Sequence, residues 1–104
     1  MTEPRLQHVL CLDSKGLHRM AYWEWGEPSN RHVLVCAHGL SRQGRDFDTL
    51  ARAMSDRYRV VCPDVVGRGR SDWLVDPMGY VVPAYVADMV TLLARLDAEV
   101  LHWV

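Results

Sequence analysis

Residues 33–47 read VLVCAHGLSRQGRDF, an apolar run that stops at His38-Gly39 and gives way to a polar loop with two arginines. The mostly apolar residues 32–37 are typical of a β-strand that is covered on both faces. In open α/β sheets, sites form at the carboxyl ends of strands, which is where His38, Gly39 and Leu40 are expected. A glycine here permits a sharp turn that would direct the N–H of Leu40 toward an oxyanion. A plain strand-to-helix turn explains these few residues at least as well.

Strand and helix patterns alternate on both sides of this stretch. Hydrophobic periodicity predicts strands at about 6–12, 19–25, 32–37, 59–63 and 99–104, and helices at about 46–55 and 83–97. Asp46 is the predicted N-cap of the first helix, and Pro83 suits the first turn of the second. The first two strands form a predicted antiparallel hairpin. The β-α-β-α-β order that follows predicts an α/β fold, with parallel strands and helices packed on the sheet.

A second glycine-containing segment, CPDVVGRGRSDW at residues 62–73, also begins at the carboxyl end of a predicted strand. It is not a dinucleotide-binding fingerprint, because the position of the third glycine holds Asp72 and no helix pattern follows at once. The sequence has no GxxxxGK(S/T) phosphate-binding loop either. Arg68 and Arg70 could hold an anion, although solvated loop arginines are the simpler interpretation.

The two segments HGL…GRDF and PDVVGRGRSDW, separated by one amphipathic helix, together resemble the α/β-hydrolase superfamily over nearly the whole chain. The resemblance implies the N-terminal half of that fold, with an antiparallel entry hairpin followed by parallel strands and flanking helices. It implies a serine hydrolase that cleaves a carboxylic ester or related acyl bond of a small-molecule substrate, without metal or organic cofactor. The implied site consists of the N–H of Leu40 as one oxyanion-hole donor, an oxyanion loop shaped by His38 and Gly39, and a structural loop of Asp64, Gly67, Gly69 and Ser71.

Two departures from the family pattern limit what the resemblance implies. No proline follows His-Gly-Leu, which argues against the epoxide-hydrolase and dehalogenase branches, whose loop often reads His-Gly-x-Pro. The Gly-x-Ser-x-Gly nucleophile motif, which the family carries after its fifth strand, is absent from these residues. Ser41 lies three residues after His38, but proximity alone supplies neither an aligned base nor an activated hydroxyl.

Residues 1–104 are therefore interpreted as a partial α/β-hydrolase domain that lacks nucleophile, acid and base and is inactive alone. The 99–104 strand would then expose an apolar edge that pairs with a complementing chain or with another copy. The alternatives are a non-catalytic truncated fragment and an interaction or anion-binding α/β module.

Composition excludes several other classes of protein. The chain has 104 residues, of which 49% are hydrophobic and 24% charged, with a net charge of −1, so bulk charge favours neither nucleic-acid nor anionic-membrane binding. No apolar run approaches the ~20 residues of a membrane span, and the N-terminus lacks a signal-peptide pattern, so a cytoplasmic location is expected. The three cysteines, Cys11, Cys36 and Cys62, are expected to be buried free thiols. Cys36 and His38 lack a second pair with metal-ligand spacing.

Overall fold

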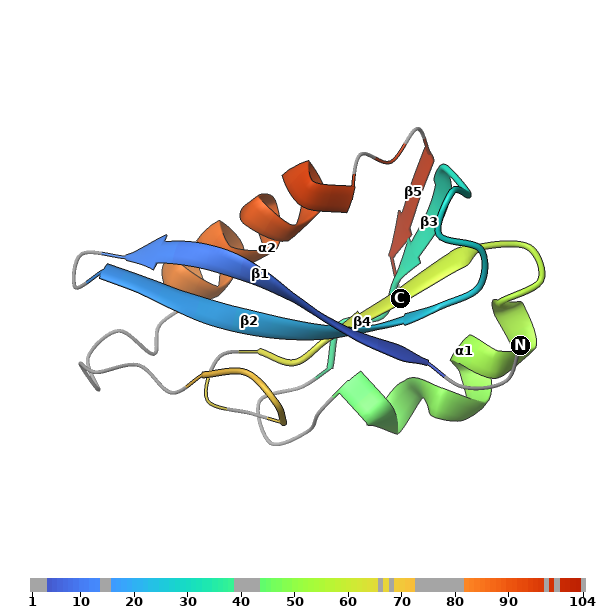
Figure 1. The fold of residues 1–104 in the computed structure, drawn as a ribbon, viewed down its shortest axis with the longest axis horizontal. Helices are drawn as coiled ribbons and strands as arrows, with labels where there is room; N and C mark the ends of the chain where they lie inside the picture. The colour runs from blue at the N-terminus through green and yellow to red at the C-terminus, as the bar shows by residue number, and fades with distance from the viewer. Residues whose placement is uncertain are drawn as a thin grey trace.

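The elements follow the predicted alternation. The computed structural model describes residues 4–13, 16–38, 44–65, 67, 69–72, 82–96, 98 and 100–103 (Figure 1). Within these residues the elements are β1 (Arg5–Asp13), β2 (Gly16–Trp25), β3 (His32–Val35), the 3-10 helix η1 (Gly44–Phe47), α1 (Asp48–Met54), β4 (Arg59–Pro63), α2 (Val82–Leu96) and β5 (Val100–Trp103). Neither described α-helix is long and apolar enough to cross a lipid bilayer.

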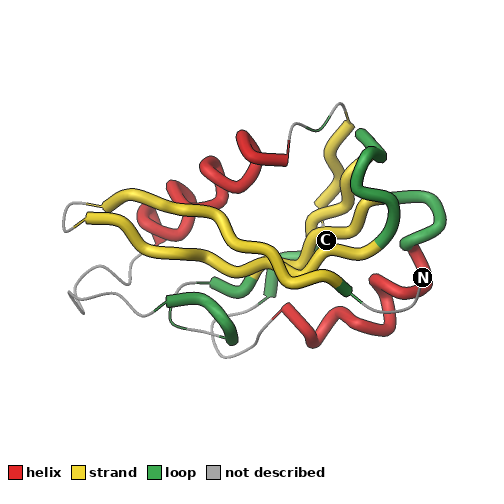
Figure 2. The backbone as a smooth tube through the Cα atoms, viewed as in Figure 1, coloured by secondary structure: helices red, strands yellow, loops and turns green. Residues whose placement is uncertain are grey.

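The described strands form one mixed sheet in the order β1-β2-β4-β3-β5 (Figure 2). β1 pairs antiparallel with β2, and β2 pairs antiparallel with β4. β3 lies between β4 and β5 and is parallel to both, with Leu34 opposite Val60 on one side and His102 on the other. This arrangement confirms the predicted α/β class, with an antiparallel entry followed by parallel strands.

The two α-helices cover opposite faces of the sheet, as Figure 1 shows. Side chains alternate along a strand, so Tyr22 of β2 packs on the α2 face with Leu92, whereas Trp25 packs on the α1 face with Ala51. β3 and β4 contribute to both cores, the α2 face receiving Val33, Val35 and Val61, and the α1 face Leu34, Val60 and Cys62. The apolar runs of these strands therefore reflect burial on both faces.

The start of the first helix differs from the prediction of a single helix over 46–55. The chain turns first through η1 and becomes α-helical only over Asp48–Met54. The N-cap of α1 is Phe47, which makes no side-chain capping bond, so the prediction of Asp46 as the cap was wrong. β3 is also shorter than the predicted 32–37, because ladder pairing ends at Val35. Cys36 nevertheless continues the hydrogen bonding, since its N–H donates to the carbonyl of Val61 at 2.9 Å.

A buried carboxylate links three neighbouring elements near one end of the sheet. Glu24 of β2 is only 3% exposed and accepts hydrogen bonds from Arg5 of β1 at 3.2 Å and from Arg59 of β4. Arg59 also donates to the carbonyl of Leu96 at 2.9 Å, which attaches the end of α2. Removing one partner of such a buried pair leaves an uncompensated charge, which costs about 3–5 kcal/mol. This network explains how a glutamate is accommodated on a largely apolar strand.

Candidate active site

The candidate site lies where the parallel strands β3 and β4 end at the same edge of the sheet. His38 follows β3, and its Nε2 accepts a hydrogen bond of 2.9 Å from the backbone N–H of Val65, which follows β4. An accepting Nε2 places the proton of the neutral ring on Nδ1. The Nε2 lone pair of His38 is thus used to join the two loops, which is a positioning role for this side chain.

Asp64 also connects the segment after β3 to the loop after β4. Its side chain is fully buried, its Oδ1 accepts the N–H of Gly44 at 2.6 Å, and its Oδ2 accepts the N–H of Arg70 at 2.8 Å. Hydrogen bonds to a buried carboxylate are charge-assisted and therefore strong. The backbone N–H of Asp64 also donates to the carbonyl of Ala21 at 2.8 Å, which anchors the loop to β2. One carboxylate thus fixes the start of η1 against the loop that follows β4.

Glycines surround Asp64 where a larger residue would not fit. A Cβ at Gly44 would overlap the carbonyl oxygen of Cys62 and lie 3.0 Å from Oδ1 of Asp64. A Cβ at Gly69 would overlap the Asp64 carboxylate, and its φ of +51° also favours glycine. Gly67 has a φ of +80°, and its N–H donates to the carbonyl of Asp72 at 2.8 Å. Gly44 and Gly69 therefore leave room for the backbone N–H groups of Gly44 and Arg70 to approach the carboxylate closely.

Ser71 and Asp72 tie the end of this loop to β2. The buried hydroxyl of Ser71 accepts the N–H of Ala21 at 2.8 Å and donates to the carbonyl of Asp64. The carboxylate of Asp72 accepts the N–H of Arg19 at 2.8 Å, and its own N–H donates to the carbonyl of Arg19 at 2.9 Å. The backbone and side-chain hydrogen bonds from Arg19 lower the pKa of Asp72 below its ordinary value. Ser71 and Asp72 of the segment after β4 are therefore hydrogen-bonded to β2.

The structure brings five of the seven residues predicted for the site into one connected region. These are His38, Asp64, Gly67, Gly69 and Ser71. Gly39 and Leu40, together with Ser41, Arg68 and the 39–43 segment as a whole, lie outside the described residues. The N–H of Arg70 is bonded to Asp64, while the residue itself is exposed.

Sequence reasoning assigned no role to Gly44, although this residue bonds directly to the buried carboxylate. The glycine is visible in the GRDF motif, but its tight neighbour is the carbonyl of Cys62, eighteen positions further along the chain. No local pattern specifies that approach. The only available signal was a glycine placed two residues before a predicted helix.

Thiol chemistry does not explain the site. Cys11, Cys36 and Cys62 are all free and buried, as the sequence predicted. The hydrogen bond with Cys36, followed by burial, raises the pKa of Cys62. Burial, followed by the charge of Asp88 and a hydrogen bond to it, raises the pKa of Cys11 to about 12. A nucleophilic cysteine needs a lowered pKa and access to substrate, so neither Cys62 nor Cys11 qualifies. The hydrogen bond with Cys62 lowers the pKa of Cys36, but this thiol is fully buried and has no access to substrate.

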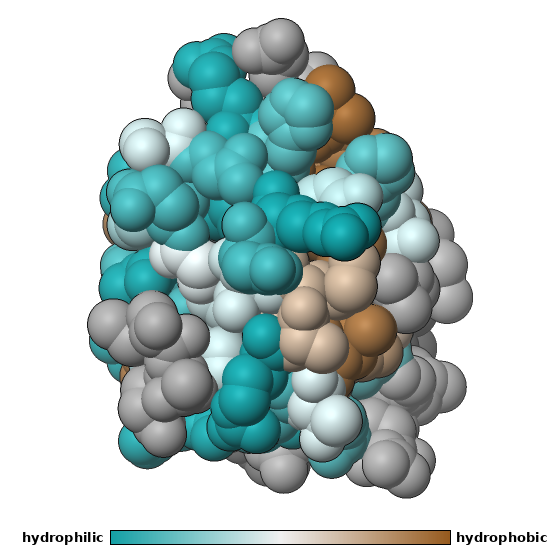
Figure 3. All heavy atoms as spheres, turned by 90° about the vertical axis from the view of Figure 1, so that its right-hand side faces the viewer, coloured by the Kyte–Doolittle hydropathy of each residue, from teal (hydrophilic) through white to brown (hydrophobic). Residues whose placement is uncertain are grey.

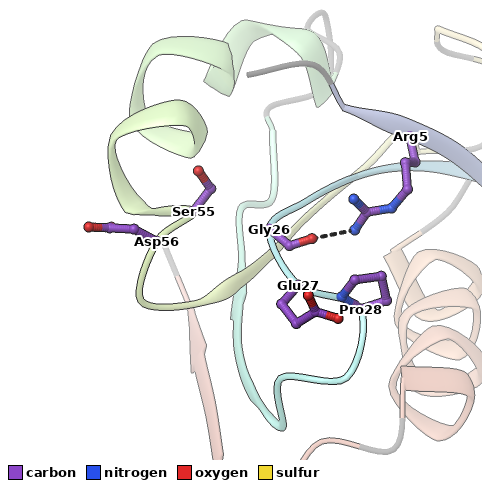
Figure 4. Close-up of a pocket in the computed structure, with 6 residues that line it drawn as sticks. All are labelled: Arg5, Gly26, Glu27, Pro28, Ser55 and Asp56. Carbon is purple, nitrogen blue, oxygen red and sulfur yellow. Dashed lines mark hydrogen bonds between the residues drawn. The ribbon is translucent and has the colours of Figure 1, made fainter. Parts of the chain in front are cut away.

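A separate pocket of about 400 Å³ lies at the opposite edge of the sheet, near the amino end of β4 (Figure 4). There Arg5 donates to the carbonyl of Gly26 at 2.7 Å, and the other lining residues are Glu27, Pro28, Ser55 and Asp56. That end of the molecule, on the right in Figure 1, has a mostly hydrophilic surface with a smaller hydrophobic area (Figure 3). None of the five described residues of the predicted site lines this pocket.

Comparison with known proteins identifies the same architecture. No protein-family model matches the chain. A 3-hydroxybutyrate-oligomer hydrolase from Cupriavidus necator is 67% identical over 100 residues, which cover 96% of this chain and 34% of that protein. An α/β hydrolase from Novosphingobium aromaticivorans has 35% identity and a TM-score of 0.81, with 99% of this chain and 35% of the other covered. A putative hydrolase from Rickettsia typhi has 27% identity and a TM-score of 0.86, with 98% and 38% covered.

The chain spans about a third of the length of these relatives and structures. The match extends over nearly all of the chain and includes the mixed sheet with its antiparallel entry. The chain belongs to the α/β-hydrolase superfamily and corresponds to the N-terminal portion of that fold.

Proposed function

We propose that this chain forms the oxyanion-loop side of a serine-hydrolase active site that cleaves carboxylic ester bonds. The observation that carries the proposal is the anchoring of His38 and Gly44, the residues on either side of 39–43, by the loop after β4. His38 precedes the segment and accepts the N–H of Val65, and Gly44 follows it and donates to Asp64. Anchors of this kind suit a loop whose backbone N–H groups must be in place before the reaction begins.

The proposed reaction step is stabilisation of the tetrahedral intermediate. When a nucleophile attacks the ester carbonyl, the carbonyl oxygen becomes an oxyanion, and the N–H of Leu40 donates a hydrogen bond to it. The nucleophile, the acid and the base are proposed to come from residues outside these 104, in the two thirds of the relatives' length that this chain does not span. Under this proposal, these 104 residues supply a donor for the oxyanion but not the nucleophile that generates it. They are therefore expected to be inactive alone.

The proposed substrate class is short oligomers of 3-hydroxy acids joined by ester bonds. The relative that is 67% identical over 96% of this chain is named a 3-hydroxybutyrate-oligomer hydrolase, and this supports the assignment. An ester of a hydroxy acid needs no metal for hydrolysis by a serine nucleophile, because the backbone donors supply the electrostatic stabilisation.

The test compares two substitutions at Leu40 in the full-length protein. Leu40→Ala keeps the backbone N–H and is expected to retain most of kcat on a 3-hydroxybutyrate dimer. Leu40→Pro deletes the N–H, and losing one oxyanion donor lowers kcat about 10²–10³-fold. Circular dichroism and thermal melting establish that the proline variant is folded. A folded Leu40→Pro enzyme with the kcat of Leu40→Ala would refute the assignment, and a wild-type enzyme inactive on all esters would refute the reaction class.

A further inference from the structure

A cluster of three potential metal ligands lies on the α2 face of the sheet and shares no residue with the candidate active site. Cys11 of β1 and His18 of β2 are direct cross-strand partners, and Asp88 of α2 packs against them. The three residues are 1%, 7% and 4% exposed. One donor atom from each lies within 4.8 Å of the other two, and Nε2 of His18 is 2.9 Å from Oδ2 of Asp88. Three separate elements therefore bring sulfur, nitrogen and oxygen donors to one buried point (Figure 1).

We propose that Cys11, His18 and Asp88 bind a structural Zn²⁺ ion. Thiolate, imidazole and carboxylate are the ligands that zinc uses, at about 2.0–2.3 Å, which places ligand atoms roughly 3.3–3.8 Å apart in a tetrahedron. The observed separations require the donors to shift by less than about 1.5 Å to admit the ion. Most structural zinc sites have four protein ligands, whereas these three leave the fourth position of a tetrahedral ion to water or a further group.

With Zn²⁺ bound, the cluster would carry no net charge. The thiolate formed on binding and the carboxylate would carry two negative charges, which Zn²⁺ cancels while the imidazole stays neutral. Burying a charge without compensation is costly, so a neutral cluster is the favourable arrangement in this interior. On binding, the Zn–S bond replaces the S–H bond of Cys11, and the proton leaves to solvent.

The ion would fasten the β1-β2 hairpin to α2. Cys11 belongs to the apolar core that α2 forms with this face of the sheet, with Met20 and Leu92 among its members. The ligands are buried, and the predicted site residues lie on other segments, at the ends of β3 and β4. The inference is thus of a stabilising centre, independent of the proposed esterase chemistry.

The experiment titrates the metal-stripped, reduced full-length protein with Co²⁺ and then with Zn²⁺. Co²⁺ should bind with tetrahedral visible bands and a thiolate-to-cobalt charge-transfer band, and Zn²⁺ should displace it at one ion per chain and raise Tm. Cys11→Ser should abolish the charge-transfer band, and Asp88→Asn should weaken Zn²⁺ binding at least about 100-fold, since even outer-shell changes cost about 10–100-fold. Cys62→Ala and His32→Gln, outside the cluster, should leave the titration unchanged.

Circular dichroism of each stripped variant separates loss of a ligand from loss of the fold, and the serine and asparagine changes are close in size to the originals. A folded wild-type protein that takes up no Co²⁺ or Zn²⁺ would overturn the proposal and leave the cluster as a hydrogen-bonded packing contact. Binding that persists unchanged in Cys11→Ser and Asp88→Asn would overturn it equally, because the metal would then lie elsewhere.

Discussion

Replacing Asp64 by alanine removes a fully buried carboxylate that holds two loops together. Each hydrogen bond to a charged group contributes about 1.5–3 kcal/mol, which gives about 3–6 kcal/mol for the bonds from Gly44 and Arg70. Arg70 is exposed, so its N–H can bond to water, whereas Gly44 is buried and its N–H would be left without a partner. The variant no longer has to bury a charged carboxylate, and the desolvation free energy that it avoids offsets part of the loss. The expected fall in the free energy of unfolding is about 3 kcal/mol.

The assay is urea unfolding of the full-length protein, followed by circular dichroism. Asp64→Asn retains one acceptor oxygen and is expected to lose about half as much stability as Asp64→Ala. Asp56→Ala removes an exposed carboxylate after α1 and should change stability by no more than about 0.5 kcal/mol. If Asp64→Ala unfolded at the same urea concentration as Asp56→Ala, the claim that this carboxylate holds the two loops together would be wrong.

Three further perturbations test the packing, the electrostatics and the sheet edge. Gly44→Ala should destabilise the protein by about 1–3 kcal/mol and lower kcat for the proposed ester hydrolysis, because its Cβ would overlap the Cys62 carbonyl; unchanged melting would contradict this. Hydrogen bonds from Arg19 lower the pKa of the Asp72 carboxyl in the folded protein below its ordinary value of 3.8, so ionised Asp72 should stabilise the fold above pH 3.8. This stabilisation should be lost as the pH falls through the lower folded pKa. The difference in the free energy of unfolding between wild type and Asp72→Asn should shrink over that pH range, and a constant difference would refute the claim. The isolated 104-residue chain should self-associate on size-exclusion chromatography through the open side of β5, and Trp103→Lys should reduce this; a monodisperse wild-type monomer would argue against an exposed pairing edge.

Much of the fold follows from local pattern. The apolar runs near 33–37 and 59–63 predict strands buried on both faces, and the structure places β3 and β4 in the interior of the sheet. The helix start at 44–48 did not follow, because Asp46 satisfies the composition of an N-cap while the observed N-cap, Phe47, makes no side-chain capping bond. Tertiary contact decided that boundary, since the N–H of Gly44 bonds to Asp64, twenty residues away.

The sequence by itself determined which segments form strands and helices, apart from their exact boundaries, and which segments follow the carboxyl ends of β3 and β4. These features depend on hydrophobic period and on glycine, both of which act over a few neighbouring residues. Only the tertiary structure decided the strand order, the joining of His38 to Val65, and the meeting of Cys11, His18 and Asp88. His18 and Asp88 are seventy residues apart, and no local propensity brings them together. Such contacts arise only when the sheet and α2 pack into a common core, and burial then makes a hydrogen bond or a shared ion favourable.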